Sequence, residues 1–180
     1  MDSILSLAVC AAGICGAQLA YWLPLKKRDR FRLRALLDLI MVIPLSRLMV
    51  FGNSGCLDAL LLLVIYAVYF TCAAVSTHLC TRLDWAASAY CSVWIVLTSE
   101  SVYELWRVLI WTAEALGMRH LSLYSTPMLL GQLGFTVVCC IVVRFTVART
   151  MPEDGTYHIG PRQLGSAGLM GVMFVFQFFA

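Results

Sequence analysis

The chain consists of long apolar runs separated by short polar stretches, from its first residues to its last. A helix crosses the bilayer core with about 20 mostly apolar residues. The pattern therefore predicts an all-α fold, a polytopic transmembrane bundle of about six spans. The predicted spans are residues 3–25, 35–51, 57–79, 85–106, 126–147 and 164–180.

The fourth apolar run is too long for one straight span. It stays largely apolar from Trp85 to about Ala113. We expect the span to end near Trp106 and the run to continue as a segment at the membrane interface. An outer loop is predicted over residues 114–125, and an inner loop over residues 149–163.

The composition agrees with a membrane domain. The chain has 180 residues, of which 61% are hydrophobic and 13% charged. Soluble domains have roughly 45–50% apolar and about 25% charged residues. This excludes a soluble enzyme and a nucleic-acid-binding domain with a basic surface. The length leaves room for a single domain, residues 1–180.

The positions of the cations predict the orientation. Cytoplasmic loops of membrane proteins carry an excess of Lys and Arg. No cation precedes the first run, whereas Lys26–Arg34 follows it, so we expect the N-terminus outside. Ten of the 13 cations fall at predicted inner ends or loops: Lys26, Lys27, Arg28, Arg30, Arg32, Arg34, Arg82, Arg144, Arg149 and Arg162.

Several charged residues fall within or beside the spans, where a charge is costly and marks a functional candidate. Arg47 lies about 20 Å along the helix from Arg34, and Glu100 about 22 Å from Trp85, which places both in the outer half. Glu104 shares a helix face with Glu100. The candidate ligand-binding residues are Arg47, Asp58, Glu100, Glu104 and Arg107, with Gln132 as a weaker candidate.

Two interpretations of this cluster remain open. The residues form interhelical ion pairs that fix the packing, or they line a polar pocket open to the outside. Asp38 lies near the inner end of its span, where we expect it to be solvated or paired with an arginine.

No catalytic or metal site is predicted, and no cofactor is expected. The histidines, His78, His120 and His158, fall in three different regions. The eight cysteines form no C-x-x-C motif and lie mostly in apolar runs, which is typical of small buried hydrophobic residues. We also find no phosphate-binding glycine loop.

Three segments carry a resemblance to a known family. They are Leu23–Arg34 (LPLKKRDRFRLR), Tyr90–Glu100 (YCSVWIVLTSE) continuing to Glu104-Leu105-Trp106, and Met151–Leu164 (MPEDGTYHIGPRQL). In this order they resemble the membrane sensor region of bacterial GHKL-type sensor histidine kinases, broadly like the quorum-sensing peptide receptors. The third segment is the most specific. The resemblance implies a bacterial cytoplasmic membrane protein that senses an extracellular peptide or small molecule in a two-component system.

The chain departs from this family in one respect. It contains no ATP-binding domain, and His158 lies in a predicted loop between spans, so no phosphoacceptor is assigned. We expect the sensor half alone, without enzymatic activity. Six crossings would leave residue 180 outside, and the last run stops without a polar cap. We therefore expect the kinase region to lie beyond this sequence.

Two other functions remain open. The first is the substrate-binding membrane subunit of a vitamin or ion importer, which has about six spans and no ATPase of its own. The second is a small packing subunit without a ligand. The expected partners are the lipid bilayer and an extracellular peptide or small molecule, with a second copy of the chain as an open alternative.

Overall fold

The structure is a computed structural model, which describes residues 2–52, 59–117 and 125–148 and the single positions 160, 165 and 169. These residues form five helices and no strand, so the all-α prediction is confirmed for this part of the chain. The helices are α1 (Asp2–Trp22), α2 (Phe31–Gly52), α3 (Ala59–Cys80), α4 (Trp85–Ala115) and α5 (Thr126–Phe145). The predicted last span, residues 164–180, falls outside the described residues except at two positions.

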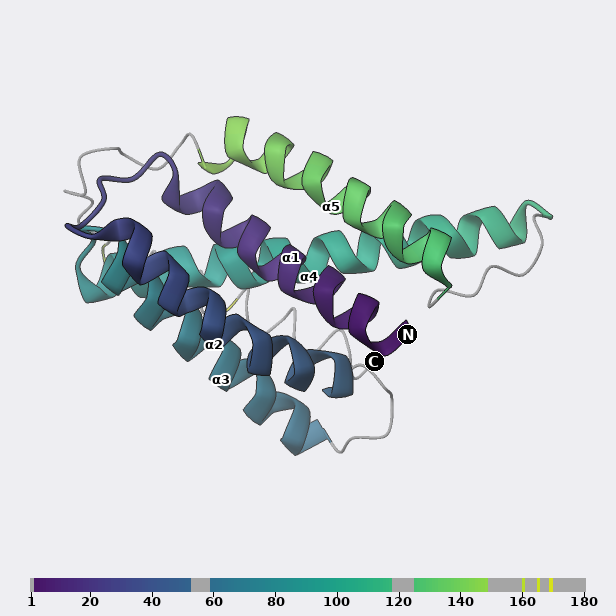
Figure 1. Ribbon diagram of the computed structural model, residues 1–180, viewed down its shortest axis with the longest axis horizontal. Coiled ribbons are helices and arrows are strands. Elements are labelled where there is room, and N and C mark those ends of the chain that lie inside the picture. Colours follow the sequence, from purple (N-terminus) through teal and green to yellow (C-terminus); the bar gives the residue numbers. More distant parts are fainter. Residues whose placement is uncertain are drawn as a thin grey trace.

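Helix α1 is central in the bundle. It packs against α5, α2 and α4, while α3 packs against α4 and α2 (Figure 1). Small residues on α1 allow this close approach, because a Cβ added to Gly16 would lie 2.9 Å from the Cys140 Sγ of α5. Such small residues are typical where membrane helices meet closely.

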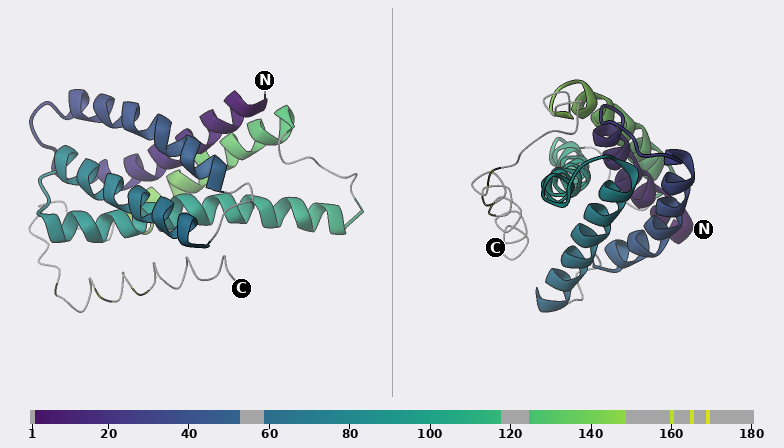
Figure 2. Two further views of the ribbon diagram at one scale, coloured as in Figure 1. Left: turned by 90° about the horizontal axis from the view of Figure 1, so that it is seen from below. Right: turned by 90° about the vertical axis from the view of Figure 1, so that its left-hand side faces the viewer.

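Helix α4 is longer than one crossing requires. It has 31 residues, or about 45 Å at the helical rise, against a hydrocarbon core of about 30 Å. Figure 2 shows its far end extending past the neighbouring helices. The expected end of the span near Trp106 does not interrupt the helix. No glycine or proline occurs between Leu105 and Ala115, so nothing in this stretch breaks the helix.

Three helices are long and apolar enough to cross a membrane: Ile4–Trp22, Leu60–Cys80 and Thr126–Phe145. Three is fewer than the roughly six expected. The other two helices each carry four charged residues: Arg32, Arg34, Asp38 and Arg47 in α2, and Glu100, Glu104, Arg107 and Glu114 in α4. The three apolar helices indicate a membrane protein.

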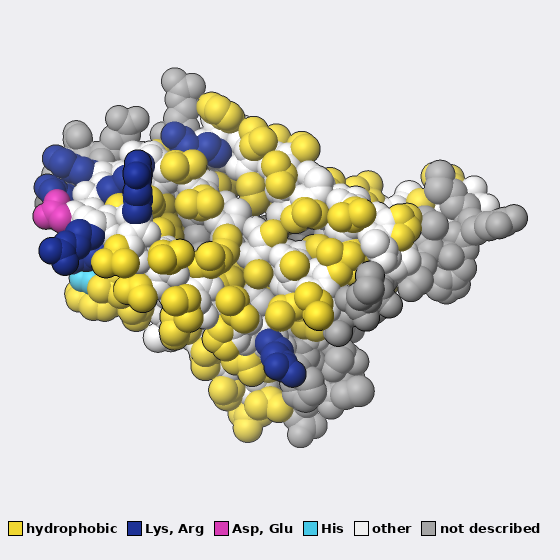
Figure 3. Space-filling model, in the orientation of Figure 1, with side chains coloured by type: hydrophobic (Ala, Val, Ile, Leu, Met, Phe, Trp, Pro, Cys, Tyr) yellow, Lys and Arg dark blue, Asp and Glu magenta, His cyan; other side chains and the backbone are white. Residues whose placement is uncertain are grey.

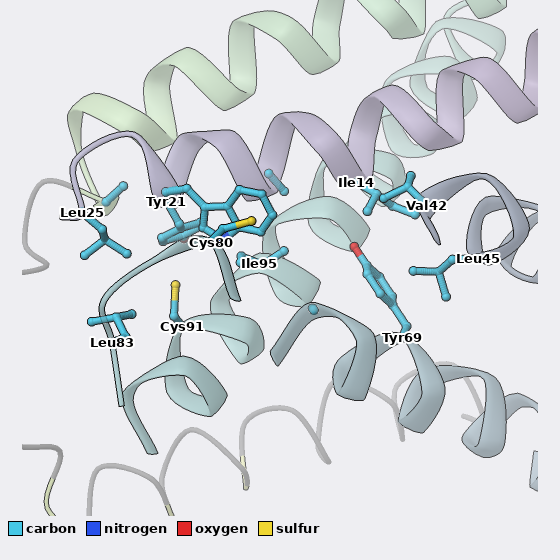
Figure 4. Packing of buried hydrophobic residues seen from close by; sticks show 14 of the residues in the cluster. Ile14, Tyr21, Leu25, Val42, Leu45, Tyr69, Cys80, Leu83, Cys91 and Ile95 are labelled. Carbon is cyan, nitrogen blue, oxygen red and sulfur yellow. The ribbon is translucent and has the colours of Figure 1, made fainter. Parts of the chain in front are cut away.

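The core lies where α1, α2, α3 and α4 meet. Ile14 and Tyr21 of α1, Val42 of α2, Tyr69 of α3 and Ile95 of α4 are almost completely buried there (Figure 4). In a membrane such contacts stabilise the fold through close packing and interhelical hydrogen bonds, because lipid tails are as apolar as the side chains. This core holds the first half of α4, which contributes Ala87, Cys91 and Ile95, in place against its neighbours.

Candidate functional site

Glu100 is the most deeply buried acidic side chain of α4. It is 6% exposed and accepts a hydrogen bond from the Tyr66 hydroxyl of α3, with 3.2 Å between the two oxygens. A buried carboxylate needs such donors, because its transfer out of water is costly. Within the described ion pairs no cation contacts Glu100. Among the described residues, this hydrogen bond engages only one of the two carboxylate oxygens, Oε2.

Glu104 and Arg107 form a local ion pair one turn further along α4. Arg107 Nη1 lies 2.8 Å from Glu104 Oε1, and both side chains are 30% exposed. The Arg107 guanidinium also lies over the Trp111 ring, 5.0 Å from its centroid. A pair at this spacing stabilises a helix by about 0.2–0.5 kcal/mol. It fixes the position of Arg107 more than it stabilises the protein.

A cavity of about 70 Å³ lies beside these residues, between α1, α2, α4 and α5. Its polar lining consists of Ser6, Ser99, Glu100, Arg107, Gln132 and Thr136, with Tyr103, Trp106 and Cys10 also on the wall. Pockets that bury a drug-sized ligand have roughly 300–1,000 Å³. This cavity is large enough for a small polar group or a few waters, and too small to enclose a vitamin or a peptide.

Trp106 closes the cavity between α4 and α5. A Cβ added to Gly131 would lie 2.9 Å from the ring, and the Phe135 ring centroid lies 5.6 Å from that of Trp106. The indole nitrogen is buried and has no hydrogen-bond partner among the described residues. The wall thus contains both an unused donor, at Trp106, and a carboxylate acceptor, at Glu100.

Polar pairs connect the helices at the cavity wall and next to it, on the side of the basic end of the bundle. The Tyr69 hydroxyl lies 2.7 Å from Ser99 Oγ, and the Tyr21 hydroxyl lies 3.0 Å from Thr98 Oγ1. These pairs link α3 and α1 to α4 immediately before Glu100. A displacement of α4 at the cavity would therefore strain both hydrogen bonds.

The structure brings together only part of the predicted cluster. Glu100 and Arg107 line the cavity, and so does the weaker candidate Gln132 of α5, while Glu104 holds Arg107. Arg47 is exposed and does not line it. Asp58 lies outside the described residues.

The face of the helix explains the position of Arg47. The helical rise predicts a similar depth for Arg47 and Glu100, but depth does not determine direction. Met49, two residues further along α2 and about 200° around the helix, lines the cavity instead, together with Val50. The sequence alone did not reveal which face of α2 packs inward.

Asp38 also differs from its prediction. It was expected to be solvated or paired with arginine, but it is 8% exposed and accepts a hydrogen bond of 3.4 Å from Gln18 Nε2. The physical reason is the packing of α1 against α2, which covers this face. The sequence-based prediction considered only water or a charged partner for Asp38, and it did not include Gln18 of α1.

Metal binding finds no support in the described part of the chain, where no group of three or more His, Cys, Asp or Glu side chains lies together. His78 lies at the end of α3, away from the cavity lining. His120 and His158 fall outside the described residues.

Comparison of the chain with family models, curated proteins and solved structures finds no match.

Proposed function

We propose that the chain is a membrane sensor module in which the cavity beside Glu100 receives an extracellular cue. The observation that carries this proposal is the buried Glu100 carboxylate on the wall of a cavity shared by four helices. An ionisable group at membrane depth is costly to keep and is a functional candidate for that reason. An ion pair that only fixed the packing would not need a cavity beside it.

The finer parts of the proposal come from the sequence. The distribution of cations supports about six spans with the N-terminus outside, which would place the cavity towards the outer face. The three-segment resemblance supports a bacterial cytoplasmic membrane and coupling to a cytoplasmic GHKL kinase domain. On this proposal the chain itself has no catalytic role.

The cavity restricts the chemistry of the cue. Glu100 accepts hydrogen bonds or a positive charge, and Trp106 offers a free N–H. The volume admits one small group, so a peptide or larger molecule would insert one polar group and leave the remainder outside. A primary ammonium, such as a peptide N-terminus, fits this chemistry because it is compact and donates to carboxylates.

Helix α4 would transmit the signal. It runs from the basic end of the bundle to the cavity, and its Ser99 and Glu100 contact Tyr69 and Tyr66 of α3. A cue that competes with Tyr66 for the Glu100 carboxylate would favour a different position of α4 relative to α3. Helix shifts of about 1–2 Å are a known mode of switching.

The importer alternative receives less support. Such a subunit encloses its substrate, and a vitamin does not fit in about 70 Å³. Gene neighbourhood provides a cheap test: a response regulator beside this gene favours the sensor, and a partner ATPase favours the importer.

Thermal unfolding of the chain in phosphatidylcholine nanodiscs tests the cue chemistry. The probes are short peptides with a free N-terminus and the same peptides N-acetylated. We expect the free peptides to raise the unfolding midpoint of the wild type and to have no effect on Glu100→Gln. Glu114→Gln, on the same helix but outside the cavity lining, is the matched control and should keep the response. Equal responses of Glu100→Gln and wild type would contradict the proposal.

A further inference from the structure

The loop between α1 and α2 docks on the loop between α3 and α4. The Arg28 backbone N–H donates to the Cys80 carbonyl (3.1 Å), and that of Arg82 donates to the Lys26 carbonyl (2.9 Å). Lys27 and Thr81 form an isolated antiparallel bridge. Most Lys and Arg side chains seen in Figure 3 gather at this end of the molecule. The basic residues therefore lie on a fixed backbone.

Two arginines bind the end of α3. Arg28 Nε donates to the Thr81 carbonyl (2.7 Å), and Arg34 Nη1 donates to the Leu79 carbonyl (2.6 Å). Cations are stabilising at this end of a helix, where the last carbonyls carry partial negative charge. A guanidinium has five N–H donors, so each arginine is held in place and retains further donors.

A surface hollow of about 320 Å³ lies between Arg28, Arg34, Arg82 and Asp29. Among the described residues, Asp29 is the only acid on its wall. Asp29 pairs with Arg82 at 3.6 Å, and the side chains of Asp29 and Arg82 are 95% and 52% exposed, respectively. Exposed pairs of this kind contribute little, so a stronger anion can replace Asp29. Three arginines against one aspartate leave the hollow with a net positive charge.

Exposed apolar side chains lie close to Arg34, which follows Leu33 in α2 and donates to the Leu79 carbonyl of α3. Leu33 and Leu36 of α2 and Leu79 of α3 are about half exposed, on the lateral surface that faces lipid in a membrane. A ligand with a phosphate and long acyl chains would match both surfaces, because arginine binds phosphate through paired N–H groups. Free phosphate would contact only the arginines of the hollow, and not the apolar side chains.

We propose that this hollow, defined by Arg28, Arg34 and Arg82, binds the headgroup of an anionic phospholipid at the predicted cytoplasmic face. The phosphate would sit between the arginines in place of the Asp29 carboxylate, and the acyl chains would run along α2 and α3. Basic pockets between membrane helices bind such headgroups by the same chemistry.

Native mass spectrometry of the detergent-purified chain tests this site, with phosphatidylglycerol, phosphatidylcholine and inorganic phosphate as probes. We expect phosphatidylglycerol to bind more tightly than phosphatidylcholine. Arg82→Gln should weaken that binding about fivefold, as the loss of one surface cation predicts. Asp29→Asn should strengthen it, because the competing carboxylate is gone. Both side chains are exposed, so we expect both variants to fold, and their unfolding midpoints verify it.

Arg144→Gln is the matched control. It removes one cation from the last turn of α5, at the same end of the bundle but outside the hollow, and should leave binding unchanged (Figure 1). If Arg144→Gln weakens binding as much as Arg82→Gln, net charge alone explains it and the site is overturned. The site is also overturned if Asp29→Asn binds phosphatidylglycerol no more tightly than the wild type does. If inorganic phosphate binds as tightly as the lipid, the phospholipid assignment fails.

Discussion

The Tyr66 hydroxyl of α3 donates a hydrogen bond to the Glu100 carboxylate of α4, with 3.2 Å between the oxygens. This bond joins two helices at the depth of the cavity, and it is made to the group that we propose as the receptor for a cue. The bond that joins α3 to α4 is therefore made to the same carboxylate that a bound cue would contact.

Replacing Tyr66 with Phe should destabilise the fold by about 1–3 kcal/mol, since a buried carboxylate loses its donor. Tyr69→Phe removes the neighbouring tyrosine hydroxyl and is the variant for comparison. It should cost less, about 0.5–1.5 kcal/mol, because Ser99 keeps its bond to the Val96 carbonyl (2.9 Å). The unfolding midpoint of each variant in nanodiscs measures the difference. Equal losses would show that the charge of Glu100 adds nothing to this contact.

Replacing Gly131 with Ala should separate α4 from α5. The added Cβ would lie 2.9 Å from the Trp106 ring, and overpacking of this kind costs about 1–3 kcal/mol. Gly134→Ala is the matched control on the same helix, where an added Cβ meets nothing within 4 Å. That variant should be neutral or stabilising by up to about 1 kcal/mol. Trp fluorescence during thermal unfolding measures the stability of both variants.

Replacing Asp84 with Ala should loosen the first turn of α4. Asp84 Oδ1 accepts the Ala87 backbone N–H at 2.8 Å, and the loss of such an N-cap costs about 0.5–2 kcal/mol. Asp84→Asn keeps an acceptor and should restore most of the stability. Hydrogen exchange over residues 85–88 measures the change. Unaltered exchange in Asp84→Ala would contradict the cap's contribution.

Replacing Glu100 with Gln should leave the fold at least as stable as the wild type. The amide oxygen still accepts from Tyr66, and the cost of burying a carboxylate disappears. Glu104→Gln should also change stability by less than about 1 kcal/mol, because its pair with Arg107 is partly exposed. The unfolding midpoints of both variants, measured without any cue, test these two expectations. A large loss in Glu100→Gln would mean that the carboxylate is a structural group.

The apolar runs predicted much of the helical framework. Predicted spans 3–25 and 126–147 correspond to Asp2–Trp22 and Thr126–Phe145, because long hydrophobic segments leave few alternatives to a helix in a membrane. Helix α4 exceeded its predicted span of 85–106, since apolar and helix-favouring residues continue to Ala115. The sequence could not distinguish an interfacial turn from a straight continuation.

The sequence identified part of the site, but it did not show which faces of the helices line the cavity. Glu100 and Arg107 were identified because charges stand out in an apolar run. Gln18 and Trp106 were missed as site or network residues, because an uncharged polar side chain gives no comparable signal. Arg47 was included for its predicted depth, but it is exposed and outside the cavity lining, because the face of α2 that packs inward depends on tertiary contacts.

Access of water to the cavity tests the central claim most directly. In a chain whose eight native cysteines are replaced, Gln132→Cys and Leu130→Cys are treated from the outer side with a small cationic methanethiosulfonate. Gln132 is buried on the cavity wall, whereas Leu130 is exposed on the lateral surface of the bundle. We predict that only Gln132→Cys reacts, and that adding Glu100→Gln slows this reaction but not that of an anionic reagent. Reaction at Leu130→Cys alone, or no effect of Glu100→Gln, would contradict the account.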